Sequence, residues 1–88
     1  RDWIEWTPNV ISSNVDLHNE TAEISMTSFT PNFRSTQQLR EDGYWTDCED
    51  RLRLPLKKSH NRFAFRTVNL FGVSGPVHRI EIVWVKAD

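Results

Sequence analysis

Apolar and polar side chains alternate with a period of two in several short segments of this chain. The pattern is clearest at residues 62–69 and 78–85, which flank a loop that contains glycine and proline. Because successive side chains of an extended strand point to opposite faces, each segment is predicted to be a half-buried strand. The side chains expected to face the core are Phe63, Phe65, Thr67, Ile80, Ile82 and Trp84.

Further strand patterns lie in the N-terminal half of the chain. Residues 22–27 alternate alanine, isoleucine and methionine with polar side chains, which predicts another half-buried strand. A shorter alternation at Val15 and Leu17 precedes a polar turn expected at residues 18–21. A more polar strand, rich in threonine and glutamine, is expected at residues 33–39.

The middle of the chain carries turn signals. Asp42-Gly43 is typical of a tight hairpin turn, so a return strand is expected to follow directly. Residues 47–51 are expected to form a charged loop. Pro55 interrupts the leucine-rich alternation that follows, and this limits the segment to a sheet edge or a strand end.

These segments together predict an all-β fold. Helical periodicity is not convincing anywhere, and turn signals recur about every 8 to 12 residues, as in sandwiches and barrels. We therefore expect a two-layer antiparallel β-sandwich of about seven strands, with residues 1–88 forming a single domain. A chain of 88 residues has a thin core and little room for a buried active-site cleft besides.

The first eight residues are rich in large apolar side chains for a chain end, which is normally polar unless it is tied down. We expect residues 1–8 to be a linker or interdomain segment, with Trp3 or Trp6 covering one end of the sandwich or packing on a preceding domain. The first residue is Arg1, not Met, so we expect either a piece cut from a longer precursor or an engineered fragment. No apolar run approaches the roughly 20 residues that span a bilayer, so membrane insertion is not expected.

Residues 63–76 resemble the last hairpin of fibronectin type III-like domains. Phe63, Phe65, Thr67 and Asn69 stand at its inward-facing and asparagine positions, and residues 72–76 stand at its Gly-, Ser- and Pro-bearing loop. The resemblance implies a fibronectin type III-like or immunoglobulin-like sandwich that has diverged. It also implies an accessory module of the kind appended to bacterial secreted multidomain enzymes, with an extracellular or periplasmic location and the cytoplasm left open.

Two positions depart from the family pattern. The tyrosine that usually opens the penultimate strand corresponds to Asn61, so the tyrosine-corner hydrogen bond is expected to be missing. The tryptophan usual on the second strand is absent from residues 22–27.

The formal net charge of −1 hides an asymmetry along the chain. Residues 1–50 carry three basic and ten acidic side chains, whereas residues 51–88 carry eight and two. The two halves interleave in a sandwich, so either the charges compensate across neighbouring strands or a basic face serves an anionic partner. Nucleic acid is not expected as a partner, because the basic residues are dispersed.

Catalytic chemistry has no recognisable motif in this sequence. Cys48 is the only cysteine, so no intramolecular disulfide can form. The candidate pairs of a nucleophile and a base are Cys48 with His18, His60 or His78, and none sits in a recognisable nucleophile elbow or Gly-rich turn. Cys48 is expected to be a half-buried strand residue. We therefore expect no enzymatic activity and no cofactor.

Asp47, Glu49 and Asp50 cluster in the predicted charged loop. Hard cations such as Ca²⁺ take several oxygen ligands from such loops, but the spaced carboxylates and glycine of a dedicated calcium loop are missing. We expect a solvated acidic turn and no metal site.

Four aromatic residues outside the predicted core are candidates for contact with a ligand or a neighbouring domain: Trp3, Trp6, Tyr44 and Trp45. The leading hypothesis is a non-catalytic spacer or packing module of a larger multidomain protein, whose partners are neighbouring domains of the same polypeptide. The alternative is a carbohydrate- or protein-binding module, in which exposed aromatic rings stack on the ligand. Whether Trp45 points inward or outward depends on a strand register that the sequence leaves open.

Overall fold

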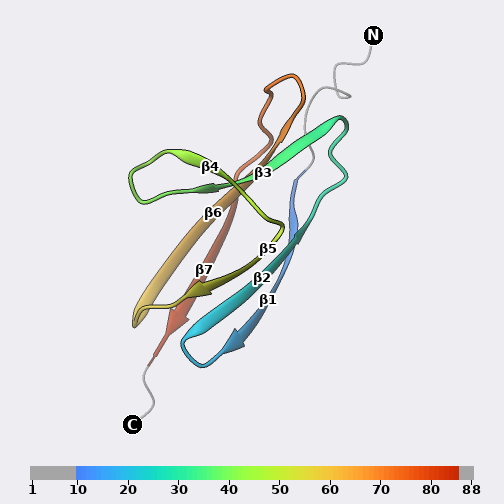
Figure 1. Ribbon diagram of the computed structural model, residues 1–88. Helices are drawn as coiled ribbons and strands as arrows, with labels where there is room; N and C mark the ends of the chain where they lie inside the picture. Colours follow the sequence, from blue (N-terminus) through green and yellow to red (C-terminus); the bar gives the residue numbers. More distant parts are fainter. Residues whose placement is uncertain (1–9, 86–88) are drawn as a thin grey trace.

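The structure is a computed structural model that describes residues 10–85, and within this range it contains seven strands and no helix (Figure 1). Two antiparallel sheets pack as a sandwich, which confirms the predicted fold class. The first sheet has the order β1-β2-β5, and the second has the order β4-β3-β6-β7. The strands are β1 (Ser12–His18), β2 (Thr21–Thr27), β3 (Phe33–Leu39), β4 (Trp45–Cys48), β5 (Arg51–Pro55), β6 (Ser59–Asn69) and β7 (His78–Trp84).

The predicted alternation of β6 and β7 is confirmed. Phe65 is fully buried between the sheets, and Phe63 and Ile80, which are direct cross-strand neighbours, pack against the same core. The buried members of the core cluster are Ile11, Ile24, Met26 and Phe65. Trp84 occupies the expected face but is only half-buried, because it ends β7.

The first sheet has an uneven inner face. Ala22, Ile24 and Met26 of its central strand β2 are buried, as their alternation predicted. Val15 and Leu17 pair with Ile24 and Ala22, so they share that face, yet Leu17 remains 61% exposed. β1 is an edge strand of the first sheet, so the second sheet covers the inner face of β1 only in part.

The connection between β4 and β5, which joins the two sheets, is shorter than the sequence predicted. The expected charged loop at residues 47–51 is wrong at both ends, because Asp47 and Cys48 belong to β4 and Arg51 opens β5. Residues 49–50 alone form the connection between β4 and β5, and the Met26 amide donates to the Asp50 carbonyl at 2.8 Å. This bond closes β2 where the ladder to β5 ends.

A β-bulge in β3 changes the direction of one aromatic side chain. Phe33 pairs with Asn69, and Ser35 pairs with Val68, so Arg34 is the extra residue on β3. Without the bulge, Phe33 would share the outer face with Ser35. The extra residue turns Phe33 toward the space between the sheets, as bulges commonly re-aim a side chain.

Asn61, which stands where the family pattern has a tyrosine, makes hydrogen bonds of its own to the backbone. Its side-chain oxygen accepts from the Lys57 amide at 2.8 Å, and its side-chain nitrogen donates to the Lys57 carbonyl at 2.8 Å. The same nitrogen reaches the Ile82 carbonyl at 3.2 Å. No tyrosine hydroxyl makes a corner bond here; instead the Asn61 amide, which can both donate and accept, bonds to the backbone four residues upstream.

Candidate interaction surface

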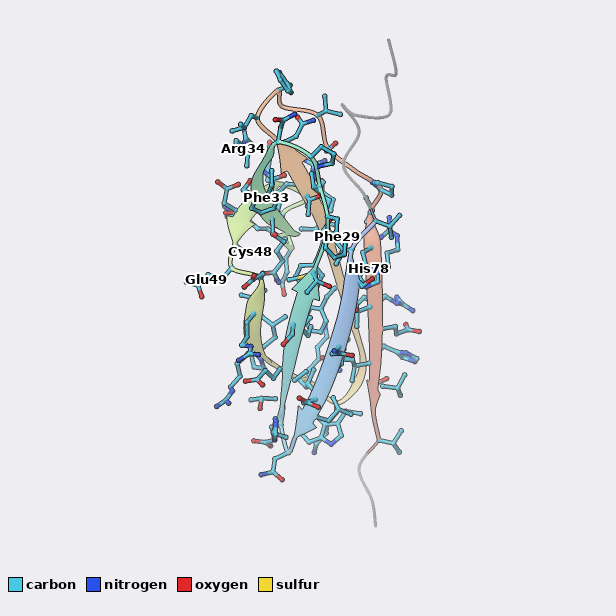
Figure 2. The ribbon with its side chains drawn as sticks, turned by 90° about the vertical axis from the view of Figure 1, so that its right-hand side faces the viewer. Phe29, Phe33, Arg34, Cys48, Glu49 and His78 are labelled. Carbon is cyan, nitrogen blue, oxygen red and sulfur yellow. The ribbon has the colours of Figure 1, made fainter. Side chains whose placement is uncertain are left out.

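The β2–β3 and β6–β7 connections lie at the same end of the sandwich (Figure 1), and both carry exposed large apolar side chains. Figure 2 labels Phe29 and Phe33 among them. Phe29 is 91% exposed and Leu70 is 64% exposed. We name this surface the loop end, and its members are Phe29, Phe33, Leu70, Phe71 and Val73. β1 begins at the same end, since Ser12 pairs with Thr27.

Asn69 shapes the β6–β7 loop. Its side chain is fully buried, and its side-chain oxygen accepts from the amides of Phe71 at 2.9 Å and Val73 at 3.0 Å. Gly72 takes a φ of 78°, a left-handed conformation that glycine adopts without strain. The loop is therefore held by its own internal bonds, which keep Phe71 and Val73 at the surface.

A second set of hydrogen bonds joins the two connections. The hydroxyls of Thr30 and Thr67 lie 2.9 Å apart in the interior, and Ser28 extends the chain to Thr30 at 2.6 Å. The Leu70 amide donates to the Asn32 carbonyl at 2.7 Å. The loop end is thus a pre-organised surface, and presenting it to a partner costs little ordering entropy.

A cavity of about 350 Å³ opens beneath the loop end, between the two sheets. Buried Ile11 and Met26 line it, with Phe29 and Phe33 among the more exposed lining residues. Thr36, Thr67 and Asp50 add polar atoms to the lining. Its volume lies at the lower end of the range of small ligand pockets.

The outer face of the second sheet carries Trp45. The Arg66 guanidinium carbon lies 4.3 Å from the centre of its ring, within cation–π distance. Arg66 also donates to the Gln37 side chain at 2.9 Å, and Gln37 donates to Asp47 at 3.1 Å. The hydrogen bonds from Gln37 and then Ser35 hold the pKa of the Asp47 carboxyl below its usual value.

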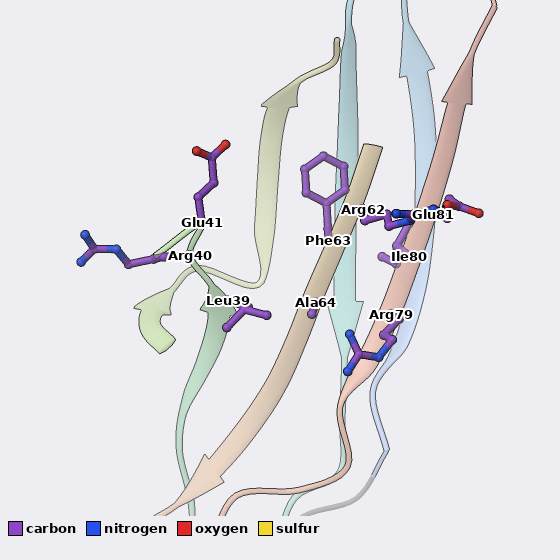
Figure 3. Close-up of a pocket in the computed structure, with 9 residues that line it drawn as sticks. All are labelled: Leu39, Arg40, Glu41, Arg62, Phe63, Ala64, Arg79, Ile80 and Glu81. Carbon is purple, nitrogen blue, oxygen red and sulfur yellow. Dashed lines mark hydrogen bonds and ion pairs between the residues drawn. The ribbon is translucent and has the colours of Figure 1, made fainter. Parts of the chain in front are cut away.

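The same outer face holds an open groove of about 410 Å³ (Figure 3). Leu39, Ala64 and Arg79 form a row across β3, β6 and β7 in this groove. The Nε of Arg62 donates to Glu81 at 2.8 Å, and this bond lowers the pKa of the Glu81 carboxyl. Acidic and basic side chains therefore compensate each other along the groove, which weakens it as a site for a strongly charged ligand.

Of the aromatic candidates from the sequence, Trp3 and Trp6 lie outside the described residues. Tyr44 is exposed and precedes β4. Trp45 is half-buried on the outer face, where its own sheet holds it under Arg66. Within residues 10–85 the remaining candidates, Tyr44 and Trp45, therefore do not form an exposed pair of rings in contact with each other.

Cys48 is a half-buried strand residue, as expected. Burial, with Asp47 and Asp50 nearby, raises the pKa of its thiol to about 11. A thiol of this kind is protonated at neutral pH and is a poor nucleophile. Residues 10–85 contain no group of three or more side chains placed to hold a metal ion, and no helix long and apolar enough to cross a bilayer.

The sequence pattern does not single out Phe29, Leu70 or Phe71, because all three lie outside the predicted strands. Loops are normally polar. The signal in the sequence that could have pointed to these residues is that they are large and apolar yet lie near turn-forming residues such as Pro31 and Gly72. Only the structure shows that the two loops meet at one end of the molecule.

Comparisons with known proteins give no match: no family model, no curated protein and no solved structure is significantly similar to this chain.

Proposed function

We propose that this chain is a non-catalytic β-sandwich module of a larger protein, and that its loop end packs against a neighbouring domain of the same polypeptide. The observation that carries the proposal is the exposure of Phe29, Leu70 and Phe71 on loops that hydrogen bonds hold in place. Sizeable exposed apolar patches mark interaction sites in soluble proteins. The module would fix the position of its neighbour.

A fibronectin type III-like relationship is part of this proposal. In constant-type immunoglobulin domains the fourth strand belongs to the first sheet, whereas here β4 pairs with β3 in the second sheet. This division favours the fibronectin type III-like alternative over the constant-type immunoglobulin one. An extracellular or periplasmic location, as in secreted multidomain enzymes, is the setting we propose.

The alternative, a carbohydrate-binding module, has less support. Arg66 lies over the ring of Trp45, so a sugar would have to displace a guanidinium that already has a hydrogen-bond partner. Polysaccharide pull-down tests it directly. Retention that Trp45→Ala abolishes would favour the alternative.

The packing proposal is tested by calorimetric unfolding of the longer protein that contains this chain. A neighbour packed on the loop end is expected to unfold together with the module in one coupled transition. The double variant Phe29→Ser/Leu70→Ser should separate the two transitions, because it removes apolar area only at the loop end.

The matched control is Val83→Ser, which changes an exposed valine near the opposite end of β7. It is expected to leave the coupling intact. Domains that unfold independently in the unaltered protein would contradict the proposal.

A further inference from the structure

We propose that the free edge of β7 is an interaction surface for a second copy of this chain, which adds its own β7 in the antiparallel direction. The second sheets of the two copies would then join into one continuous sheet. This inference goes beyond the proposed function, because it concerns the side of the sandwich and not the loop end.

β7 is a long and regular edge strand. Natural edge strands are commonly protected by short length, by proline or by a bulge. β4 has only four residues, and β5 ends at Pro55. β7 has seven residues without proline, and it pairs with β6 in an unbroken register. The backbone groups that point away from β6 therefore form a template for a further strand.

Apolar side chains beside this edge lack an opposing layer. β1 and β7 lie at the same edge of the sandwich, where the Ser13 hydroxyl and Nε2 of His78 are 2.8 Å apart (Figure 2). The second sheet ends at β7, and Leu17 of β1 is 61% exposed although it belongs to the inner face. Val15 on the same face is 36% exposed. A strand added to β7 would extend the second sheet over these two side chains, and burial of their apolar area favours its addition.

The charges of β7 are complementary to those of a second β7. Arg79 and Glu81 have opposite signs and lie on the outer face, on either side of Ile80. When Ile80 of one copy pairs with Ile80 of the other, Arg79 of each copy stands opposite Glu81 of the other. Opposite charges in direct cross-strand pairs stabilise a sheet, whereas like charges destabilise it. Twofold symmetry forms both pairs at once.

Both charged groups can make this contact. The Arg79 guanidinium has no hydrogen bond or ion pair within residues 10–85. Glu81 already pairs with Nε of Arg62 at 2.8 Å and Nδ1 of His60 at 3.6 Å, but both contacts end on the same oxygen, Oε2. Its other oxygen, Oε1, can accept from a second guanidinium. Edge charges deter most strands, so the alternating signs of β7 select for a copy of the same strand.

The test uses the isolated 88-residue chain, in which no neighbouring domain is present, so its outcome is separate from that of the packing proposal. Sedimentation velocity is expected to show a concentration-dependent equilibrium between monomer and dimer. Arg79→Glu places like charges opposite each other at both contacts and should weaken the dimer at least about tenfold. Glu81→Arg should weaken it in the same way, with the opposite sign of charge.

The two charge variants should restore the dimer when they are mixed. One chain then carries acidic side chains at positions 79 and 81 and the other carries basic ones, so each contact again joins opposite charges. Loss of folding in either variant would not reproduce this rescue. Arg51→Glu, which makes the same change of charge on the outer face of the first sheet, is the matched control and should leave the dimer of the unaltered register intact.

A second pair of variants keeps the proposal testable if a charge variant fails to fold. Leu17→Ser removes apolar area that the added strand would cover, and it is expected to weaken the dimer. Leu70→Ser is its matched control, because Leu70 is 64% exposed, close to the 61% of Leu17, but lies at the loop end. This control should leave the dimer unchanged.

Three results would overturn the proposal. A chain that stays monomeric at millimolar concentration would show that the edge does not pair with its own copy. A dimer that Leu70→Ser weakens more than Leu17→Ser would place the contact at the loop end. A dimer that neither charge variant weakens, or that mixing does not restore, would exclude the pairing of Arg79 with Glu81.

Discussion

At the scale of single residues, the buried amide of Asn61 holds backbone groups of three segments together. Asn61 is buried and makes three hydrogen bonds to backbone atoms, which tie the start of β6 to the preceding loop and to β7. Removal of a group that satisfies buried backbone partners costs more than the average hydrogen bond, since those partners stay buried.

We therefore predict that Asn61→Ala lowers the free energy of unfolding by about 2–3 kcal/mol, from the loss of hydrogen bonds and the desolvated groups left behind. Urea denaturation measures this change. Asn14→Ala, on the exposed edge strand β1, is the matched control and should stay within about 0.5 kcal/mol of the original. Equal effects of the two variants would contradict the role of these hydrogen bonds.

Cys48 gives a second prediction at this scale. With a pKa of about 11, compared with an ordinary value of 9.0, its thiolate fraction at pH 8 is about 100-fold below that of an unperturbed thiol. Alkylation by iodoacetamide should therefore be slow in the folded protein and fast in urea. Rapid alkylation of the folded chain would show that the thiol is not desolvated.

At the scale of elements, the β6–β7 loop is held by one side chain. Asn69 contributes its backbone amide and carbonyl as well as its side-chain oxygen to bonds with residues 71–73. No alternating pattern encodes this arrangement. It depends on an asparagine, which readily bonds to nearby backbone groups, at the last position of a strand.

Asn69→Ala is predicted to loosen this loop. We expect faster amide hydrogen exchange at Phe71 and Val73 and a loss of about 1–3 kcal/mol of stability, because the buried acceptor disappears. Exchange in the β1–β2 hairpin, at the other end of the sandwich, is the internal reference. Unchanged exchange at Phe71 and Val73 would remove the basis for a pre-organised loop end.

The sequence predicted the strands well where apolar and polar side chains alternate with a clear period of two. β2, β3, β6 and β7 were predicted within a few residues, because their alternation and bounding turns agree. The inward turn of Phe33 could not be predicted, since it depends on one extra residue in a ladder that pairs distant strands. Likewise, Trp45 has the same local pattern whether it faces in or out, and only its pairing with Leu39 places it. The loop end and the cavity depend on contacts between segments about 40 residues apart along the chain.

At the scale of the whole molecule, charges that are uneven along the sequence become neighbours in space. Glu81 and Asp47 belong to edge strands of the second sheet, and each accepts hydrogen bonds from the strand beside it. Both carboxyls have a pKa below the ordinary values of 4.5 and 3.8. The bond between Arg62 and Glu81 supports the interpretation in which opposite charges compensate across neighbouring strands, whereas the partners of Asp47 are the neutral Ser35 and Gln37.

We predict the following pH dependence. A depressed pKa in the folded state contributes stability that is fully present above the unfolded value and is lost as the pH falls through the folded value. The melting temperature should therefore hold from neutral pH to about pH 4.5 and fall below it. Glu81→Gln should reduce this acid-induced fall, as measured by thermal scans between neutral pH and pH 2. An identical fall in the variant would assign the effect to other carboxyls.

The register of the edge strands has a mechanical consequence. β1 starts at the loop end, and β7 finishes at the opposite end, where Trp84 pairs with Ser59. Tension applied between residues 10 and 85 would run parallel to the strands, so all seven pairs of β1–β2 and of β6–β7 would bear the load together. Such shear loading resists extension far better than unzipping one pair at a time, so the described part of the chain is expected to keep its length under a pull along its strands.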